Sequence, residues 1–314
     1  MSQSFAVGRA APQPAAAQAA AGELDLRRKL QLALAVLWLL DGILQYQPSM
    51  FTKAFPQMLG QGAHGNPAVV AAPITWSAGF IGHHLAVTNG LFATIQVALG
   101  LGIAWRPTVR IALAASVAWA GAVWWLGEGL GGVLAGTASP VGGAPGAVIL
   151  YAVLAVLLWP ADRDGPFVAA RAAGRGPALA AWLAVWGSMA VFALLPASRA
   201  PQALSGMISD MASGEPNWLA WLDTRLAAAL AHQGLLASAA LAAVFTIVAA
   251  GVLLPARLGR AVLALAVVVA AALWLAQGLG GIFTGAGTDP NSAPLLALLA
   301  LSFWPASTTA AQDA

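Results

Sequence analysis

The sequence predicts an all-α integral membrane protein with about eight transmembrane helices, arranged as two tandem four-helix repeats of the same orientation. Three observations lead to this fold class. The composition suits a chain in lipid, apolar runs of helical length recur along it, and VWWLGEGLGG at 123–132 returns as ALWLAQGLGG at 272–281. The runs are continuous and rich in Ala and Leu, which indicates helices and not the alternating strands of a barrel.

Composition alone separates this chain from soluble proteins. Of its 314 residues, 60% are hydrophobic and 8% are charged, whereas soluble domains carry about 25% charged residues. So few charges cover a surface only where the solvent is lipid, and they give no reason to expect a nucleic-acid partner. The chain has no cysteine, which excludes disulfides, thiolate metal sites, iron–sulfur clusters, c-type haem attachment and cysteine nucleophiles.

Eight apolar runs are candidates for helices that cross about 30 Å of hydrocarbon, which takes roughly 17 to 25 residues. They cover residues 29–47, 86–105, 108–128, 143–160, 177–196, 233–254, 258–278 and 291–306. Apart from glycines near their outer ends, no run is visibly broken at the midplane. The last run is short, and its helix would be tilted or partly interfacial.

The ends of the chain differ in composition from these runs. The N-terminus is rich in Ala, Gln and Pro and lacks the apolar core of a signal peptide. We therefore expect residues 1–26 to form a disordered cytoplasmic tail and residues 307–314 a second one. Between them, residues 27–162 would form the first four-helix membrane repeat and residues 163–306 the second.

Basic residues predict the orientation. Eleven of the fourteen fall on the side that holds the N-terminus. These are Arg9, Arg27, Arg28, Lys29, Arg106, Arg110, Arg163, Arg171, Arg175, Arg257 and Arg260. Because cytoplasmic loops are enriched in positive residues, both termini are expected in the cytoplasm of a bacterial plasma (inner) membrane. The tryptophans agree, with Trp105, Trp159 and Trp304 at the inner interface and Trp76, Trp218 and Trp221 at the outer one.

The two halves match piece by piece. WRPTVR at 105–110 parallels LPARLGR at 254–260, and the spacing of Gly132 and Gly136 returns in Gly281 and Gly285. An even number of spans gives both copies the same orientation. Paired glycines four residues apart allow close helix contact, so we expect them in a packing seam.

Asp41 is the carboxylate placed deepest in a predicted span, with Gln45 one turn further out. A buried carboxylate must be protonated, paired or next to water. In the second span, Asn89, Gln96 and two small residues between and after them form a stripe that would face Asp41. The stripe is either the lining of a polar cavity or a hydrogen-bonded clamp without chemistry.

Glu128 ends the third span, and the second half has Gln277 in its place. Glu128 is thus a second candidate for lining a polar cavity or carrying a proton. The alternative is that its carboxylate only reaches interfacial water. The first half would then hold any site. The outer segments 48–85 and 197–232 would roof a cavity or lie on the membrane, and PSMFTKAFPQMLGQG in the first would form a short interfacial helix despite Pro56.

All four histidines map to the outer side, and His83 and His84 adjoin the second span. Imidazole suits copper, zinc or haem iron, so these two are the metal candidates. Neighbouring side chains on a helix point about 100° apart and seldom bind one ion together; interfacial histidines without a ligand are the alternative. No phosphate-binding, dinucleotide or zinc-protease motif is present.

Each half resembles a DoxX-type unit, a family of small four-span bacterial membrane proteins. LLDGILQYQPSMF at 39–51 is similar to the end of that family's first span, and IQVALGLGIAWRPTVR at 95–110 is similar to its second span and basic turn, with Gln96 where the family often has Glu. The resemblance implies a redox-associated membrane module. Some relatives are subunits of quinone-linked sulfur oxidation, and others accompany partners in redox stress or metal response.

Three functional hypotheses follow. The first is an accessory membrane subunit, redox- or stress-associated, with an outward-facing polar cavity in the first repeat and a membrane or exoplasmic partner protein. The second is a membrane oxidoreductase that uses quinone or a bound metal or haem. The third is a small-solute or ion carrier. The sequence names no catalytic residue.

Overall fold

The computed structural model describes residues 15–305, and in this range the protein is all-helical. The range contains no strand, and Phe167 and Pro305 form one isolated antiparallel bridge. Its first part contains α1 (Ala15–Gln45), η1 (Pro48–Phe51), α2 (Ala54–Gln61), α3 (Ala68–His83), α4 (Leu85–Ala104), η2 (Arg106–Thr108), α5 (Val109–Leu126), η3 (Gly129–Gly132) and α6 (Ala147–Leu157).

The second part follows the connecting helix α7 (Val168–Ala173). It contains α8 (Arg175–Ala193), α9 (Pro196–Arg199), α10 (Ala203–Met211), α11 (Asn217–Leu230), α12 (Gly234–Gly251), α13 (Ala256–Ala276), η4 (Gly278–Gly281) and α14 (Ser292–Ser302). Apart from the first pair, where α1 has 31 residues and α8 has 19, helices of similar length follow one another in the same order in both parts.

Five helices of the described chain are long and apolar enough to cross a membrane: α4, α5 with its preceding turn, α8, α12 and α13. Each of the eight predicted runs contains one helix. The first of these, α1, is longer than the five but carries Arg27, Arg28, Lys29 and Asp41.

Two of the expected spans are much shorter than their runs. Helices α6 and α14 have 11 residues each and therefore rise only about 16 Å. Pro145 and Gly146 precede α6, and Gly146 has φ of +114°, which stops the helix from extending at its N-terminal end. Neither helix is by itself long enough to cross about 30 Å of hydrocarbon, so the eight crossings stay a prediction.

The expected N-terminal tail is partly helical. Helix α1 begins at Ala15, so residues 15–26 belong to the helix that they were expected to precede. Residues 1–14 and the predicted tail 307–314 lie outside the described range.

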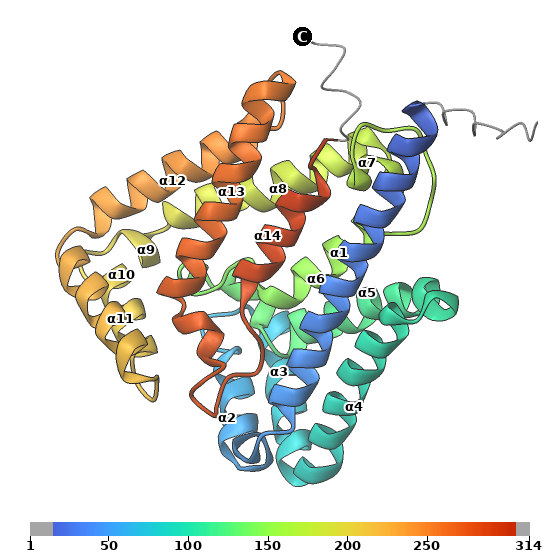
Figure 1. Cartoon of the computed structure of the whole chain (residues 1–314). Coiled ribbons are helices and arrows are strands. Elements are labelled where there is room, and N and C mark those ends of the chain that lie inside the picture. The colour runs from blue at the N-terminus through green and yellow to red at the C-terminus, as the bar shows by residue number, and fades with distance from the viewer. Residues whose placement is uncertain (1–14, 306–314) are drawn as a thin grey trace, which may run out of the picture.

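The outer segments contain more helix than the sequence indicated. Helix α2 does form where a short helix was expected, and Pro56 lies in its first turn, where a missing N–H breaks no hydrogen bond. Helices α3 and α11 were not expected; α3 even contains Pro73. Figure 1 shows α2 and α3 at the opposite end of α1 from α7.

The packing is alike in the two parts. Helix α1 packs mainly on α4 and α8 on α12, while α5 packs on α6 and α13 on α14. Helices α6 and α14 contact each other across the two parts, and α14 lies between α1 and α13 (Figure 1). Eight of the 11 residues of each of these two helices are buried, so one continuous core joins both parts.

The repeated Gly-Leu-Gly-Gly segments end the helices before them and do not form a helix-packing seam. Leu130 has φ and ψ of 56° and 33°, and Leu279 has 52° and 27°. Gly132 and Gly281 also have positive φ, of 70° and 67°. Because glycine enters this left-handed region without strain, the glycines allow a sharp turn here, and the seam predicted for them is wrong.

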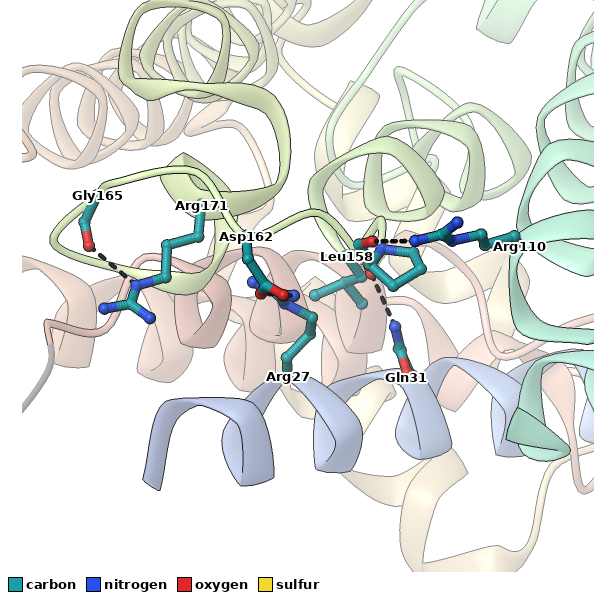
Figure 2. A network of polar contacts seen from close by, with 8 residues as sticks. Arg27, Gln31, Arg110, Leu158, Asp162, Gly165 and Arg171 are labelled. Carbon is teal, nitrogen blue, oxygen red and sulfur yellow. Dashed lines mark hydrogen bonds and ion pairs between the residues drawn. The ribbon is translucent and has the colours of Figure 1, made fainter. Parts of the chain in front are cut away.

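Basic side chains fix the end of α1 that lies near α7. The Arg27 guanidinium pairs with Asp162 at 3.0 Å, and Gln31 donates to the Leu158 carbonyl oxygen at 2.9 Å. Figure 2 shows these contacts beside that of Arg110, which donates to the Pro160 carbonyl oxygen at 3.2 Å. These contacts attach α1 and the start of α5 to the segment that follows α6.

Candidate functional site

A cavity of about 210 Å³ lies in the first part of the chain, between α1 and the outer helices. Its walls come from α1, α2, α3, α4 and α5, and most of its lining is apolar. Aromatic rings from four elements border it: Trp38, Phe55, Phe92 and Trp119. Helices α2 and α3 thus form one wall, as the roofing hypothesis expected of the segment 48–85.

Asp41, Gln45, Gln96 and Glu128 all line this cavity. Asp41 is only 2% exposed. The Tyr151 hydroxyl hydrogen-bonds to the Asp41 carboxyl. Gln96 Oε1 and Glu128 Oε2 find no hydrogen-bond donor within the described chain. Two acceptors without donors therefore belong to residues that line this cavity.

Asn89 does not line the cavity and acts as a clamp. Its Nδ2 donates to the Gln45 carbonyl oxygen at 3.0 Å, and Gln45 Nε2 donates back to Asn89 Oδ1. Next to this pair, Gly42 of α1 lies so close to α4 that a Cβ atom there would be 3.0 Å from the Val97 nitrogen. The polar stripe on α4 therefore combines the two alternatives given above: Asn89 forms a hydrogen-bonded clamp, and Gln96 lines the cavity.

Glu128 connects the cavity to the start of α6. Its Oε1 accepts a hydrogen bond from the Val148 N–H at 3.1 Å, one of the N–H groups that a helix N-terminus leaves without an internal partner. Its Oε2 lies against Gly146, where any Cβ would collide with it. Trp124 fixes the same turn by donating to the Pro145 carbonyl oxygen at 2.7 Å.

Asp289 is the lining residue that sequence reasoning missed. It follows η4 in the second part of the chain, yet it lines the cavity of the first. Its Oδ2 accepts from the Thr288 hydroxyl at 2.8 Å and its Oδ1 from the Asn291 N–H at 2.7 Å. The carboxyls of Asp41, Glu128 and Asp289 lie close enough for their charges to interact.

A second, more polar chamber of about 640 Å³ adjoins the cavity. Glycine-rich turns of both parts of the chain surround it, and it shares Met58, Glu128, Thr288 and Asp289 with the inner cavity. These four residues therefore form the boundary between the two spaces. Irregular backbone at membrane depth is tolerated where it is enclosed by protein or lines a wet cavity, which fits the short α6 and α14.

The histidine pair lies away from both spaces. His83 Nδ1 is 2.7 Å from the Gly79 carbonyl oxygen, which can only accept a hydrogen bond. The His84 ring lies 4.9 Å from the Phe80 ring. Among residues 15–305, no group of three His, Cys, Asp or Glu side chains is arranged to hold a metal ion, so the geometry gives the metal hypothesis no support.

The second part of the chain has a carboxyl pair of its own that the sequence did not reveal. Glu215 and Asp223 lie together beside η4, and Glu215 Oε1 lies against Gly278. Burial first, and the charge of Asp223 second, raise the pKa of Glu215 to about 7. The corresponding residue before α3 is Asn66, whose amide donates to the Gly62 carbonyl oxygen at 2.8 Å.

Within the described residues, fold and site together define an all-helical protein with helices suited to a membrane and a mostly apolar cavity of about 210 Å³. Comparisons of the chain with protein-family models, curated proteins and solved structures find no match. The resemblance to the DoxX family therefore stays a prediction.

Proposed function

We propose that this protein is an integral membrane protein that takes a small ligand from the outer side of a bacterial plasma membrane into the cavity of its first four-helix unit. The observation that carries the proposal is the cavity of about 210 Å³, which is lined by three carboxyl groups and by aromatic rings.

A packing void is the simplest alternative to a ligand site, and its energetics argue against it. Each buried polar atom without a partner costs about 1–3 kcal/mol, and Gln96 Oε1 and Glu128 Oε2 are two such atoms. An apolar cavity of about 150 Å³ is enough to hold a benzene molecule. A bound ligand with hydrogen-bond donors would fill the space and satisfy the acceptors.

Eight crossings in two tandem units are part of this proposal. The order of helices recurs, and so do the left-handed backbone angles after α5 and α13. With both termini in the cytoplasm, the arginine-rich end of α1 faces inward and the cavity opens outward through the larger chamber.

Of the three functional hypotheses, the structural observations favour the carrier. Transporter sites are often lined by interrupted helices and the irregular backbone beside them. Helices α6 and α14 have this character, because each covers only 11 residues and continues as a turn that borders the outer chamber. The accessory-subunit and oxidoreductase hypotheses stay predictions.

The first experiment measures thermal stabilisation of the purified protein by two single-ring probes, benzyl alcohol and benzylamine. We expect at least one to raise the unfolding midpoint in a saturable manner. Ser77→Phe should abolish this effect, because Ser77 is 6% exposed and lines the cavity. Thr75→Phe on the same helix is the matched control, since Thr75 is exposed and bonds only within its own helix.

Two outcomes would contradict the proposal. One is that neither probe stabilises the protein, and the other is that Ser77→Phe responds like the parent. If Ser77→Phe does not fold, Ala122→Phe fills the same cavity from α5.

A further inference from the structure

We propose that the ligand of this cavity is a small organic cation, an ammonium group on an apolar or aromatic body, and that Asp289 of the second unit selects its charge. The inference rests on the proposed ligand site and adds the chemical class of the ligand. Three independent features support it: the balance of donors and acceptors, the charge of the site, and its aromatic walls.

Hydrogen-bond acceptors are prominent around the cavity. Asp41, Glu128 and Asp289 place three carboxyl groups there, and Gln96 Oε1 and Glu128 Oε2 have no donor among the described residues. A ligand that satisfies this set must mainly donate hydrogen bonds. An ammonium group carries three N–H donors and no acceptor, whereas a quinone carbonyl or a carboxylate would only add acceptors.

The charge of the site points the same way. Asp289 accepts hydrogen bonds on both carboxyl oxygens, from the Thr288 hydroxyl and the Asn291 N–H. Burial raises the pKa of Asp289, and these two hydrogen bonds act in the opposite direction. Among the described residues, no Lys, Arg or His lines the cavity. A cation that enters the cavity would stabilise the ionised form of this carboxyl and pair with it.

Aromatic rings give the site a preference for an organic cation. The faces of Trp, Tyr and Phe attract cations within about 6 Å. Trp38 is held in place by a hydrogen bond to the Ser116 hydroxyl at 2.9 Å, and the Phe92 and Trp119 rings meet edge to face at 5.4 Å. No described group of side chains suits a metal ion, so the geometry favours a cation with an apolar body.

Asp289 reaches the cavity because the two units interlock. The segment between η4 and α14 extends over the first unit, where the Ser49 hydroxyl donates to the Gly285 carbonyl oxygen at 2.6 Å. Gln47 donates to the Gly287 carbonyl oxygen at 3.4 Å, two residues before Asp289. The second unit therefore supplies the charge-selecting residue of the first unit's site.

The test compares the affinities of benzylamine and benzyl alcohol, which have the same ring and nearly the same size. At pH 7 we expect the parent to bind benzylamine with a Kd at least about tenfold lower than its Kd for benzyl alcohol. Asp289→Asn should remove most of this preference and leave the affinity for benzyl alcohol within about twofold. Asp210→Asn is the matched control, because Asp210 is an exposed residue of α10 outside the cavity.

A parent that binds both probes equally would overturn the ammonium assignment and leave the ligand site intact. An unchanged preference in Asp289→Asn would overturn the role of Asp289. Binding of neither probe would contradict the ligand site itself. If Asp289→Asn does not fold, Thr288→Val removes one hydrogen bond to the Asp289 carboxyl and should reduce the preference for benzylamine several-fold.

Discussion

At the scale of single residues, we expect Asp41 to lower the stability of the folded protein while it contributes to ligand binding. It is nearly fully buried, it has the Tyr151 hydroxyl as a hydrogen-bond partner, and the carboxyls of Asp289 and Glu128 lie near it. Desolvation and like charges both penalise such a carboxylate. A group with these costs persists where function requires it.

We therefore predict that Asp41→Asn raises the thermal unfolding midpoint of the purified protein while it weakens the binding of benzylamine. The amide keeps one acceptor, adds donors and carries no charge, so the repulsion among the three carboxyls decreases by about 1–2 kcal/mol. Differential scanning fluorimetry measures the first effect and titration the second. Asp164→Asn, at an exposed position, controls for the loss of one charge. A lower midpoint in Asp41→Asn alone would show that this carboxylate is structural.

Glycine is required at a specific point of the contact between α1 and α4. A Cβ atom at Gly100 would lie 2.8 Å from the Ala35 carbonyl oxygen and 2.7 Å from Leu39 Cγ. Both contacts are too short for carbon atoms, so any side chain at this position pushes the two helices apart.

Gly100→Ala should destabilise the protein by about 1–3 kcal/mol, the usual cost of overpacking. Gly90→Ala on the same helix is the control, because a Cβ there meets no atom within 4 Å and alanine favours helix by up to about 1 kcal/mol over glycine. The unfolding midpoint should fall in the first variant and stay equal or rise in the second. Equal midpoints would contradict the close approach of α1 and α4.

At the scale of elements, the segments before α3 and α11 contact the turns η3 and η4 by different chemistry. Asn66 donates from a neutral amide to the Gly129 carbonyl oxygen of the first turn at 3.4 Å, while Glu215 lies against the second with a titratable carboxyl. Glu215 and Asp223 hydrogen-bond to each other. The contact of Glu215 with the second turn is therefore sensitive to pH, and that of Asn66 with the first is not.

This difference gives a prediction with a defined sign. The pKa of Glu215 is raised from its ordinary value to about 7. A raised folded-state pKa means that the unfolded chain releases its proton first as the pH increases. The stability contributed by protonated Glu215 is thus complete below about pH 4.5 and is lost as the pH rises through 7.

Between pH 5 and pH 8, Glu215 should cost the parent about 1–2 kcal/mol of stability, allowing for its partial exposure. Glu215→Gln should remove that part of the slope of the unfolding midpoint against pH. Asp210→Asn should keep the parent slope. An unchanged slope in Glu215→Gln would show that the pair does not titrate in this range.

At the scale of the whole molecule, the number of crossings can be measured directly, because the chain has no cysteine of its own. Eight crossings place Thr52 and Ser213 outside and Asp164 inside. If only the five long apolar helices crossed, Thr52 and Asp164 would share one side and Ser213 would lie on the other.

Single variants Thr52→Cys, Asp164→Cys and Ser213→Cys, treated with a membrane-impermeant maleimide in spheroplasts, distinguish these topologies. All three positions are exposed. We expect the first and third to react in intact spheroplasts and the second only after the membrane is opened. Reaction of Thr52→Cys and Asp164→Cys on the same side would contradict the tandem four-span arrangement.

Local sequence patterns predicted much of the helical framework. Each of the eight apolar runs contains a helix. Lipid and a protein core offer no hydrogen bonds to the backbone, so an apolar segment must form its backbone hydrogen bonds internally, as a helix does. Asp41, Gln45, Gln96 and Glu128 could be singled out because polar residues are rare in such runs. Helices α3 and α11 were missed, since proline and polar residues in an outer segment are also typical of loops.

The sequence by itself determined the apolar helices, the place of four polar residues within them and the recurrence of the Gly-Leu-Gly-Gly turns. Only the tertiary structure brought Asp289 beside Asp41, brought Glu215 to η4 and left His83 and His84 outside the cavity. The physical reason is that helix formation depends on neighbours a few residues apart, which leave a periodic pattern. Contacts between the two units depend on how whole helices pack, and no local pattern records them.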